Sequence, residues 1–236
     1  MKKKCLFINL FIAALVVLLS ACGSESRDGK ETVDGKEKKV SPITIFENEY
    51  CQVVKVTLKP GEELDEHESG VRLIYALTDY TIDWYEQGQS LGEKDWNKGD
   101  VHVHKTGKHS AINIGSTKAE WIVFVRKTEE LPDFEVENLA NDINSVAGNF
   151  AKKVYDDDQF RVTEVKLPVN EAIPAHDGIN RIIYSLSNYT ISYQTDNSEP
   201  YEKSFKEEEA HWHESSKHSL KNIGNADANF LIVAYK

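Results

Sequence analysis

Cysteine is scarce in this chain, with three residues among 236. Cys5 lies inside an N-terminal apolar segment, and only Cys22 and Cys51 follow it. So few cysteines cannot build a disulfide framework, and stability must therefore come from the packing of apolar side chains. Cys51 stands at the start of an expected strand, where we interpret it as a small buried apolar residue and not as a nucleophile.

Positive charge is also in short supply, because 28 lysine and arginine residues face 39 aspartate and glutamate residues and the formal net charge is −11. Nucleic-acid binding requires a basic surface, so this balance argues against a nucleic-acid partner. The chain contains no C-x-x-C and no glycine-rich phosphate loop, and its one G-x-S-x-G match, at 88–92, lies at an expected turn between β-rich runs and not between a strand and a helix. Nucleotide-dependent chemistry therefore has no support in the sequence, and acyl transfer lacks the context that its motif requires.

What the chain does contain is an internal repeat. All eight histidines belong to four pairs with one constant spacing of 109 residues. The pairs are His67/His176, His102/His211, His104/His213 and His109/His218. With the same offset, 51–127 aligns with 160–236 without a gap, and 24 of the 77 aligned positions are identical. A fixed offset over this length indicates a duplicated domain, so the four histidines of each copy are candidates for one site that occurs twice.

Both copies have the pattern of β-strands separated by turns. Val53–Leu58 alternates between apolar and polar residues, Arg72–Tyr85 is a long β-rich run, and Trp121–Val125 closes the first copy. Turn signals that recur roughly every 8–15 residues between such runs predict an all-β sandwich or barrel. The linker between the copies has the spacing of one short amphipathic helix, with apolar residues at Phe134, Val136, Leu139 and Ile143.

The N-terminal segment resembles a bacterial lipoprotein signal. Three lysines at 2–4 precede an apolar run at 5–18 that is too short for a comfortable transmembrane helix. Leu-Ser-Ala-Cys at 19–22 is similar to a lipobox, which implies cleavage before Cys22 and acylation of that residue. Several acyl chains give stable anchoring to a bilayer, and the polar stretch that follows reads as a disordered tether. We therefore expect a lipid-anchored protein of the cell envelope that faces the periplasm or the exterior.

Two motifs in each copy resemble those of the cupin superfamily. Gly61 followed after five residues by His67 is similar to the opening of the first cupin motif. Residues 99–115, with His109 near the centre, resemble the second motif, although the segment is one residue short before the histidine and has Lys105 in place of the usual proline. The second copy replaces two of the motif glycines, with Asn170 and Glu208 at these positions.

The resemblance extends over nearly all of both copies. It implies two tandem cupin-type antiparallel barrels of the double-stranded β-helix or jelly-roll kind, an arrangement called a bicupin. The expected organisation is a signal peptide at 1–21, a tether at 22–42, a first barrel at 43–130, a linker at 131–153 and a second barrel at 154–236.

Departures from the metal-binding cupin pattern shape the expected site. Such cupins usually offer two histidines and a glutamate from the first motif and one histidine from the second. His67 and His109 match, but Ser69 occupies the second histidine position and Arg72 occupies the glutamate position. A guanidinium in place of an anionic ligand weakens the case for the usual Mn or Fe site. The second copy departs in the same way, at Gly178 and Arg181.

Two further histidines in each copy offset this loss. His102 and His104 are two residues apart on an expected strand, so both side chains point to the same face, and His211 and His213 repeat the arrangement. If that face is the barrel interior, each barrel gathers four imidazoles, which can bind a metal without a carboxylate. A divalent transition metal (Zn, Fe, Ni, Cu or Mn) is then a candidate cofactor. If the face is external, the pair belongs to the surface or to a contact between barrels.

The two matched arginines also have two interpretations. Arg72 and Arg181 either pair with surface carboxylates at a strand edge or form a bidentate clamp for a carboxylate or phosphate inside each barrel. The first hypothesis for function is therefore an envelope-anchored bicupin that binds a small anion, a divalent metal or both. The alternative is a metal-dependent oxygenase or isomerase that acts on a small carboxylate-bearing substrate. The sequence does not decide between them, and it leaves ligand, metal and oligomeric state open.

The lipobox resemblance generates a direct prediction about Cys22. Radiolabelled palmitate should be incorporated into the wild-type protein and not into Cys22→Ser, because the acylated thiol is the predicted anchor. The measurement is autoradiography of the immunoprecipitated protein from labelled bacteria. Equal labelling of the two proteins would show that the anchor assignment is wrong.

Overall fold

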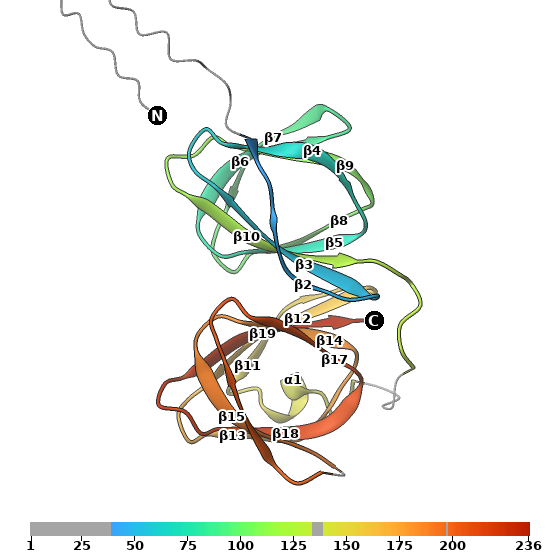
Figure 1. Cartoon of the computed structure of the whole chain (residues 1–236), viewed down its shortest axis with the longest axis vertical. Coiled ribbons are helices and arrows are strands. Elements are labelled where there is room, and N and C mark those ends of the chain that lie inside the picture. Colours follow the sequence, from blue (N-terminus) through green and yellow to red (C-terminus); the bar gives the residue numbers. More distant parts are fainter. Residues whose placement is uncertain (1–38, 134–138, 197) are drawn as a thin grey trace, which may run out of the picture. The chain divides into compact units, whose positions relative to one another are not determined.

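The computed structural model describes residues 39–133, 139–196 and 198–236. The described chain is built almost wholly of β-strands, which form two successive antiparallel barrels of two sheets each (Figure 1). Among these residues, no helix is long and apolar enough to cross a membrane. The signal peptide and Cys22 lie outside the described residues, so the anchor remains a prediction.

Barrel 1 contains β1 to β10. One sheet has the order β1-β4-β9-β6-β7, and the other has the order β2-β3-β10-β5-β8. The strands are β1 (Lys39–Val40), β2 (Ile43–Glu47), β3 (Cys51–Leu58), β4 (Glu63–Ser69), β5 (Arg72–Ala76), β6 (Tyr80–Glu86), β7 (Gln89–Trp96), β8 (Val101–His104), β9 (Gly107–Asn113) and β10 (Ala119–Arg126).

Barrel 2 contains β11 to β19 and is preceded by the helix α1 (Ile143–Val146). Its sheets have the orders β11-β12-β19-β14-β17 and β13-β18-β15-β16. The strands are β11 (Ala151–Asp156), β12 (Phe160–Leu167), β13 (Ala172–Gly178), β14 (Arg181–Ser185), β15 (Tyr189–Thr195), β16 (Tyr201–Phe205), β17 (Ala210–His213), β18 (Ser216–Asn222) and β19 (Ala228–Tyr235).

The repeat is reproduced strand by strand. The bounds of β3, β4, β5, β6, β8, β9 and β10 return 109 residues later in β12, β13, β14, β15, β17, β18 and β19. Two turns keep a left-handed backbone although the glycine is lost: φ is +77° at Gly61 and +67° at Asn170, and +92° at Gly99 and +67° at Glu208. The prediction of tandem cupin-type barrels is therefore confirmed at the level of fold.

Several local expectations need adjustment. The run Arg72–Tyr85 is not one strand, because the chain turns at 77–79 and continues as β6 in the other sheet. Lys39–Val40, within the expected tether, pairs in parallel with β4. Among the linker residues that the structure describes, helix occurs at α1, and Phe134 and Val136 of the expected helix lie outside the described residues.

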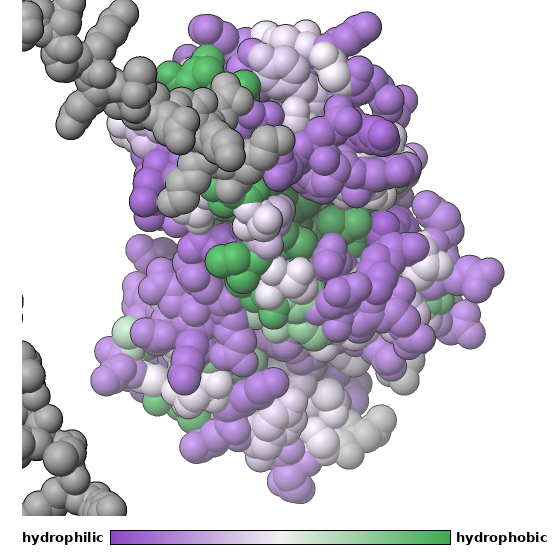
Figure 2. Space-filling view, turned by 45° about the horizontal axis from the view of Figure 1, so that its top comes forward, coloured by the Kyte–Doolittle hydropathy of each residue, from purple (hydrophilic) through white to green (hydrophobic). Residues whose placement is uncertain are grey.

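Alternation along the strands places apolar side chains on both faces of one sheet in each barrel. In β3, Val53 faces a hydrophobic cluster that joins residues of both barrels, whereas Val56 faces the interior of barrel 1. A separate cluster fills barrel 2 and includes Ile143 of α1. The outer surface is mainly hydrophilic, with hydrophobic atoms gathered near the middle of the view in Figure 2.

A buried asparagine closes the second motif in each barrel. Asn113, with no exposed surface, donates from Nδ2 to the carbonyls of Leu58 (2.9 Å) and Thr117 (2.8 Å), and its Oδ1 accepts from the Gly115 amide (3.0 Å). Asn222 makes the same three bonds in barrel 2. One side chain thus contacts three backbone groups at the point where β9 or β18 ends, and the Gly115 amide also donates to the Thr81 carbonyl at 3.1 Å.

This arrangement predicts a large effect of Asn113→Ala. The carbonyls of Leu58 and Thr117 would lose the Nδ2 donor, while the Gly115 amide keeps its bond to the Thr81 carbonyl, so the free energy of unfolding should fall by about 2 kcal/mol. The measurement is urea denaturation followed by tryptophan fluorescence. Asn97→Ala, at an exposed turn residue, should change it by less than about 0.5 kcal/mol. Similar shifts for the two variants would contradict the assigned role.

Candidate functional site

The two motif histidines of each barrel meet in its interior. His67 on β4 is the register partner of His109 on β9, and their ring centroids lie 4.1 Å apart. In barrel 2 His176 and His218 have the same relation at 4.2 Å. Nδ1 of His67 donates to the Asp65 carbonyl at 2.8 Å, which fixes the tautomer and leaves Nε2 free to meet a ligand.

The second histidine pair also lies close together, but in barrel 1 one member is already fully hydrogen-bonded. His104 donates from Nδ1 to Glu86 Oε1 at 2.9 Å, and its Nε2 accepts from Trp84 Nε1 at 3.1 Å. His102 stacks on Trp96 with 3.8 Å between ring centroids. Both nitrogens of His104 are therefore used within the protein, and the Trp84 ring lies between the two histidine pairs.

Arg72 carries a buried charge without an ion-pair partner among the described residues. The residue is 1% exposed on β5, and Nη1 donates to the Lys105 carbonyl at 2.8 Å. Its Nε is buried and has no hydrogen-bond partner in the described chain. Burial lowers the pKa of the guanidinium to about 10, while the charge of Glu86 opposes this shift. Arg72 therefore remains cationic at neutral pH, although Glu86 itself is hydrogen-bonded to His104.

A cavity of about 170 Å³ opens beside these groups in barrel 1. Its polar lining consists of Arg72, His67, His109, Ser69, Thr44, Gln52 and the exposed Glu68. Its apolar wall is formed by side chains of both sheets, namely Val54, Val56, Leu64, Ile74, Trp84, Trp121, Val123 and Val125. The cavity thus combines a buried cation with an apolar wall, a combination typical of small-molecule sites.

Barrel 2 holds its arginine with the corresponding pair of backbone carbonyls, since Arg72 Nη1 also lies 3.4 Å from the Gly70 carbonyl, but adds a contact to a histidine. Arg181 is 3% exposed and donates from Nη1 to the carbonyls of Ile179 (2.9 Å) and Glu214 (3.1 Å). Its Nη2 lies 3.4 Å from Nε2 of His218, whose Nδ1 donates to the Ser216 carbonyl at 3.2 Å. Burial lowers the pKa of Arg181 to about 10. No carboxylate of the described residues forms an ion pair with it, so neutral acceptors hold this charge.

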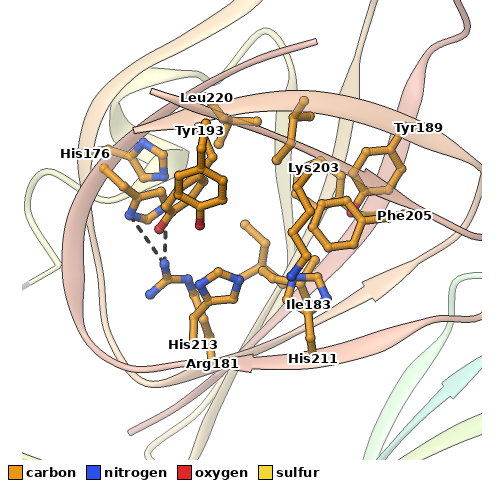
Figure 3. Close-up of a pocket in the computed structure, with 15 residues that line it drawn as sticks. His176, Arg181, Ile183, Tyr189, Tyr193, Lys203, Phe205, His211, His213 and Leu220 are labelled. Carbon is orange, nitrogen blue, oxygen red and sulfur yellow. Dashed lines mark hydrogen bonds between the residues drawn. The ribbon is translucent and has the colours of Figure 1, made fainter. Parts of the chain in front are cut away.

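The interior pocket of barrel 2 is smaller, about 40 Å³. It lies on the side of Arg181 that faces His211 and His213 (Figure 3). Tyr193 replaces Trp84 and opens a passage to the second histidine pair, so all four histidines line one space. Arg181 and His213 point into it from one side, while Lys203 packs over Phe205 at 4.8 Å on the other. No aspartate or glutamate of the described residues lines this pocket.

The linker fills the part of barrel 2 that corresponds to the barrel 1 cavity. Asp142 caps α1, accepts from the Ser145 amide (3.1 Å), and pairs with Arg161 at 2.7 Å. Ile143 is 5% exposed and packs into the barrel cluster. Only about 30 Å³ remains beside Arg181 at this mouth. The yellow helix is seen across the ring of barrel 2 strands in Figure 1.

The buried imidazoles are neutral at physiological pH. Burial and the charge of Arg72 lower the pKa of His109 to about 3, and burial, His104 and nearby cations lower that of His102 to about 2. Burial and the Lys203 and Arg181 charges lower the pKa of His211 to about 3. The pKa of His218 is depressed further by burial and Arg181. Neutral imidazoles suit metal ligation. Here, however, the positive charges of Arg72 and Arg181 contribute to the low pKa values, and the same charges would repel a metal ion.

The donor set does not fit the metal site of the cupin pattern. Among the described residues, no three His, Cys, Asp or Glu side chains are grouped as one metal ion requires. Nε2 of His218 faces Arg181, and a divalent ion about 5 Å from that guanidinium would meet a repulsion of roughly 6–7 kcal/mol at an effective dielectric constant near 20. The eight-histidine metal site remains a prediction that this arrangement does not favour.

Several residues of the two pockets were not singled out from the sequence. Trp84 divides the interior of barrel 1, Glu86 orients His104, and Trp121 lines the cavity. Lys203 lines the barrel 2 pocket. The offset of 109 could have found Lys203, because Lys94 is its identical counterpart. Trp84 and Glu86 left no such signal, since the second copy has Tyr193 and Thr195 there.

Comparison with solved structures shows the fold. AerE from Microcystis aeruginosa is 17% identical, with a TM-score of 0.57 over 83% of this chain and 97% of that one. A tyrosine-for-tryptophan variant of oxalate decarboxylase from Bacillus subtilis is 12% identical, with a TM-score of 0.59 over 82% and 71%. The oxalate decarboxylase–formate complex from Lactobacillus farciminis is 13% identical, with a TM-score of 0.57 over 83% and 80%. The two barrels therefore have the cupin fold in the bicupin arrangement.

Sequence comparisons add no closer relative. No family model matches the chain. No curated protein matches it either. At these identities the structural likeness is one of fold, and activity must be argued from the site itself.

The close packing of Arg181 against Gly178 predicts that Gly178→Ser destabilises the protein. A Cβ at Gly178 would lie 2.6 Å from Arg181 Nη1 and 3.0 Å from His218 Cε1, so the guanidinium must move. Overpacking of this kind should lower the free energy of unfolding by about 1–3 kcal/mol. The reverse exchange in barrel 1, Ser69→Gly, is the matched control and should cost at most about 1 kcal/mol. The measurement is the thermal unfolding of both variants. An unchanged unfolding temperature in Gly178→Ser would contradict the packing of Arg181 against Gly178.

Proposed function

We propose that the protein is a binding module for a small anion, a carboxylate in particular, with Arg72 in the barrel 1 cavity as the recognition group. The observation that carries the proposal is a guanidinium that is 1% exposed, has an unpaired Nε, and lines a cavity of about 170 Å³ without an ion-pair partner in the described chain. A buried charge of this kind is costly unless an opposite charge reaches it.

The buried groups around Arg72 support an anionic ligand, whereas the one carboxylate of the lining, Glu68, is exposed on β4. Nε2 of His67 is left free by the bond of Nδ1 to the Asp65 carbonyl. Ser69 adds a hydroxyl on the same wall. Guanidinium and carboxylate match as paired donors and acceptors, and such charge-assisted bonds are stronger than neutral ones. The formate complex of one fold neighbour is consistent with a barrel of this type receiving a small carboxylate.

A metal-dependent enzyme is the second candidate, and no specific arrangement of the described side chains favours it. Its metal would need ligands beyond the His67–His109 pair, but His104 is fully hydrogen-bonded and Arg72 adds a positive charge. Lipid anchoring at the cell envelope through Cys22 completes the proposal. That part rests on the sequence of the N-terminal segment, and the bilayer would then be the second partner.

Replacement of Arg72 tests the anion site. In isothermal titration calorimetry with sodium acetate and sodium formate, Arg72→Met should bind about 10- to 100-fold more weakly than the wild type, because a charge-assisted hydrogen bond is lost. Methionine retains much of the volume, and removal of an unpaired buried charge should leave the barrel folded.

Lys94→Ala provides the matched control. It removes one positive charge from the same barrel, at an exposed residue that packs over Trp96 at 4.6 Å and does not line the cavity. Its affinity should stay within about twofold of the wild type, since screened surface charges contribute little. Equal losses in both variants would point to a general charge effect, and acetate binding that survives Arg72→Met would refute the site.

A further inference from the structure

We infer that the ligand of barrel 1 is a monocarboxylate with a compact apolar body of about six carbon atoms, a single ring or a branched chain, whose charge meets Arg72 and whose body lies against Trp84 and Trp121. This inference rests on the proposed anion site and specifies the class of molecule that occupies it.

The size of the cavity sets the first limit. A cavity of about 150 Å³ lined by apolar side chains accepts benzene, and the barrel 1 cavity has about 170 Å³. Formate or acetate would leave most of this space unfilled. A ring or branched chain with one carboxylate fills it, whereas a longer or multi-ring body would exceed it.

The distribution of polarity sets the second limit. Arg72, His67 and His109 line one part of the cavity, and an aromatic and aliphatic wall that includes Trp84 and Trp121 lines another. Among the lining residues Arg72 is the one permanent cation, and it is buried, whereas the one carboxylate, Glu68, is exposed to solvent. A ligand with a single charged end and an otherwise apolar surface matches this division, because each part of it meets groups of its own polarity.

A chain of hydrogen bonds holds the apolar wall in place. Glu86 accepts from His104 Nδ1 at 2.9 Å, and His104 Nε2 accepts from Trp84 Nε1 at 3.1 Å. The indole ring is thus fixed from behind by groups outside the cavity lining. A wall ordered before binding loses little conformational freedom when a ligand packs on it, so affinity gained from the apolar body is retained.

The second barrel shows that this fold can close the same space. There the linker residue Ile143 and the Asp142–Arg161 pair reduce the corresponding volume to about 30 Å³. Barrel 1 carries the shorter Gln52 where barrel 2 carries Arg161, and Gln52 lines the open cavity. One copy of the repeat has therefore been filled by its own chain while the other is left open to a molecule of ring size.

Three probes separate the contributions of charge and apolar body. The full chain, purified in detergent with blank titrations subtracted, is titrated by calorimetry with sodium benzoate, sodium acetate and benzyl alcohol. Benzoate should bind about 10- to 100-fold more tightly than acetate, because its ring removes apolar surface from water. Benzyl alcohol should bind at least 10-fold more weakly than benzoate, since it lacks the charge. Benzoate should also change the fluorescence of the tryptophans that line the cavity.

Two variants test the volume of the cavity. Val54→Phe places a larger side chain on the apolar wall and should weaken benzoate binding at least 10-fold while leaving acetate binding within about twofold. Val123→Ile is the gentler second variant, because barrel 2 already carries Ile232 at that position, and it should weaken benzoate about threefold. Acetate binding by each variant reports that the barrel is folded and that Arg72 is in place.

Each outcome decides one of the two claims. Benzoate no tighter than acetate in the wild type would overturn the ligand class and leave the anion site standing. Benzyl alcohol as tight as benzoate would overturn the role of Arg72 in recognising the ligand. No binding of acetate or benzoate would overturn both claims. A benzoate preference that is lost in Val54→Phe, with acetate binding retained, would support the inference.

Discussion

A buried guanidinium that has no carboxylate partner governs the interior of both barrels. Arg72 and Arg181 are 1% and 3% exposed, and neither forms an ion pair with a described residue. In a medium of low polarity such a charge acts strongly on its neighbours. It helps to keep the nearby imidazoles neutral, opposes the entry of a cation, and favours an anion. The replacement of an acidic ligand position by arginine thus reverses the electrostatic preference of the fold.

The two copies respond differently to the same constraint. In barrel 2, Gly178 leaves room for Arg181 to lie directly against the backbone, where carbonyls and His218 accept its hydrogen bonds. In barrel 1, Ser69 occupies the equivalent position, and Arg72 donates to the corresponding backbone carbonyls but keeps an unpaired Nε beside an open cavity. A difference of one hydroxymethyl group therefore accompanies a change from a charge satisfied internally to one available to a ligand.

The sequence predicts the fold in some detail because duplication and strand alternation are both periodic signals. The offset of 109 places every histidine pair, and the cupin motifs place His67 beside His109. Neither signal predicts the hydrogen bond from Trp84 to His104, because an aromatic residue in a strand is compatible with many interior contacts. The sequence also does not predict that Ile143 packs into the interior of barrel 2. Linker packing depends on tertiary context and not on a repeated pattern.

The persistence of the paired histidines does not require a metal. A neutral imidazole offers one donor and one acceptor, and in two of the histidines, one in each barrel, both are used. His218 donates to the Ser216 carbonyl and accepts from Arg181, whereas His104 donates to Glu86 and accepts from Trp84. A carboxylate in place of His218 would neutralise the arginine, but an imidazole satisfies its hydrogen bonds and leaves its charge intact. Histidine beside arginine therefore keeps a barrel interior both hydrogen-bonded and positively charged, which is the condition that selective binding of an anion requires.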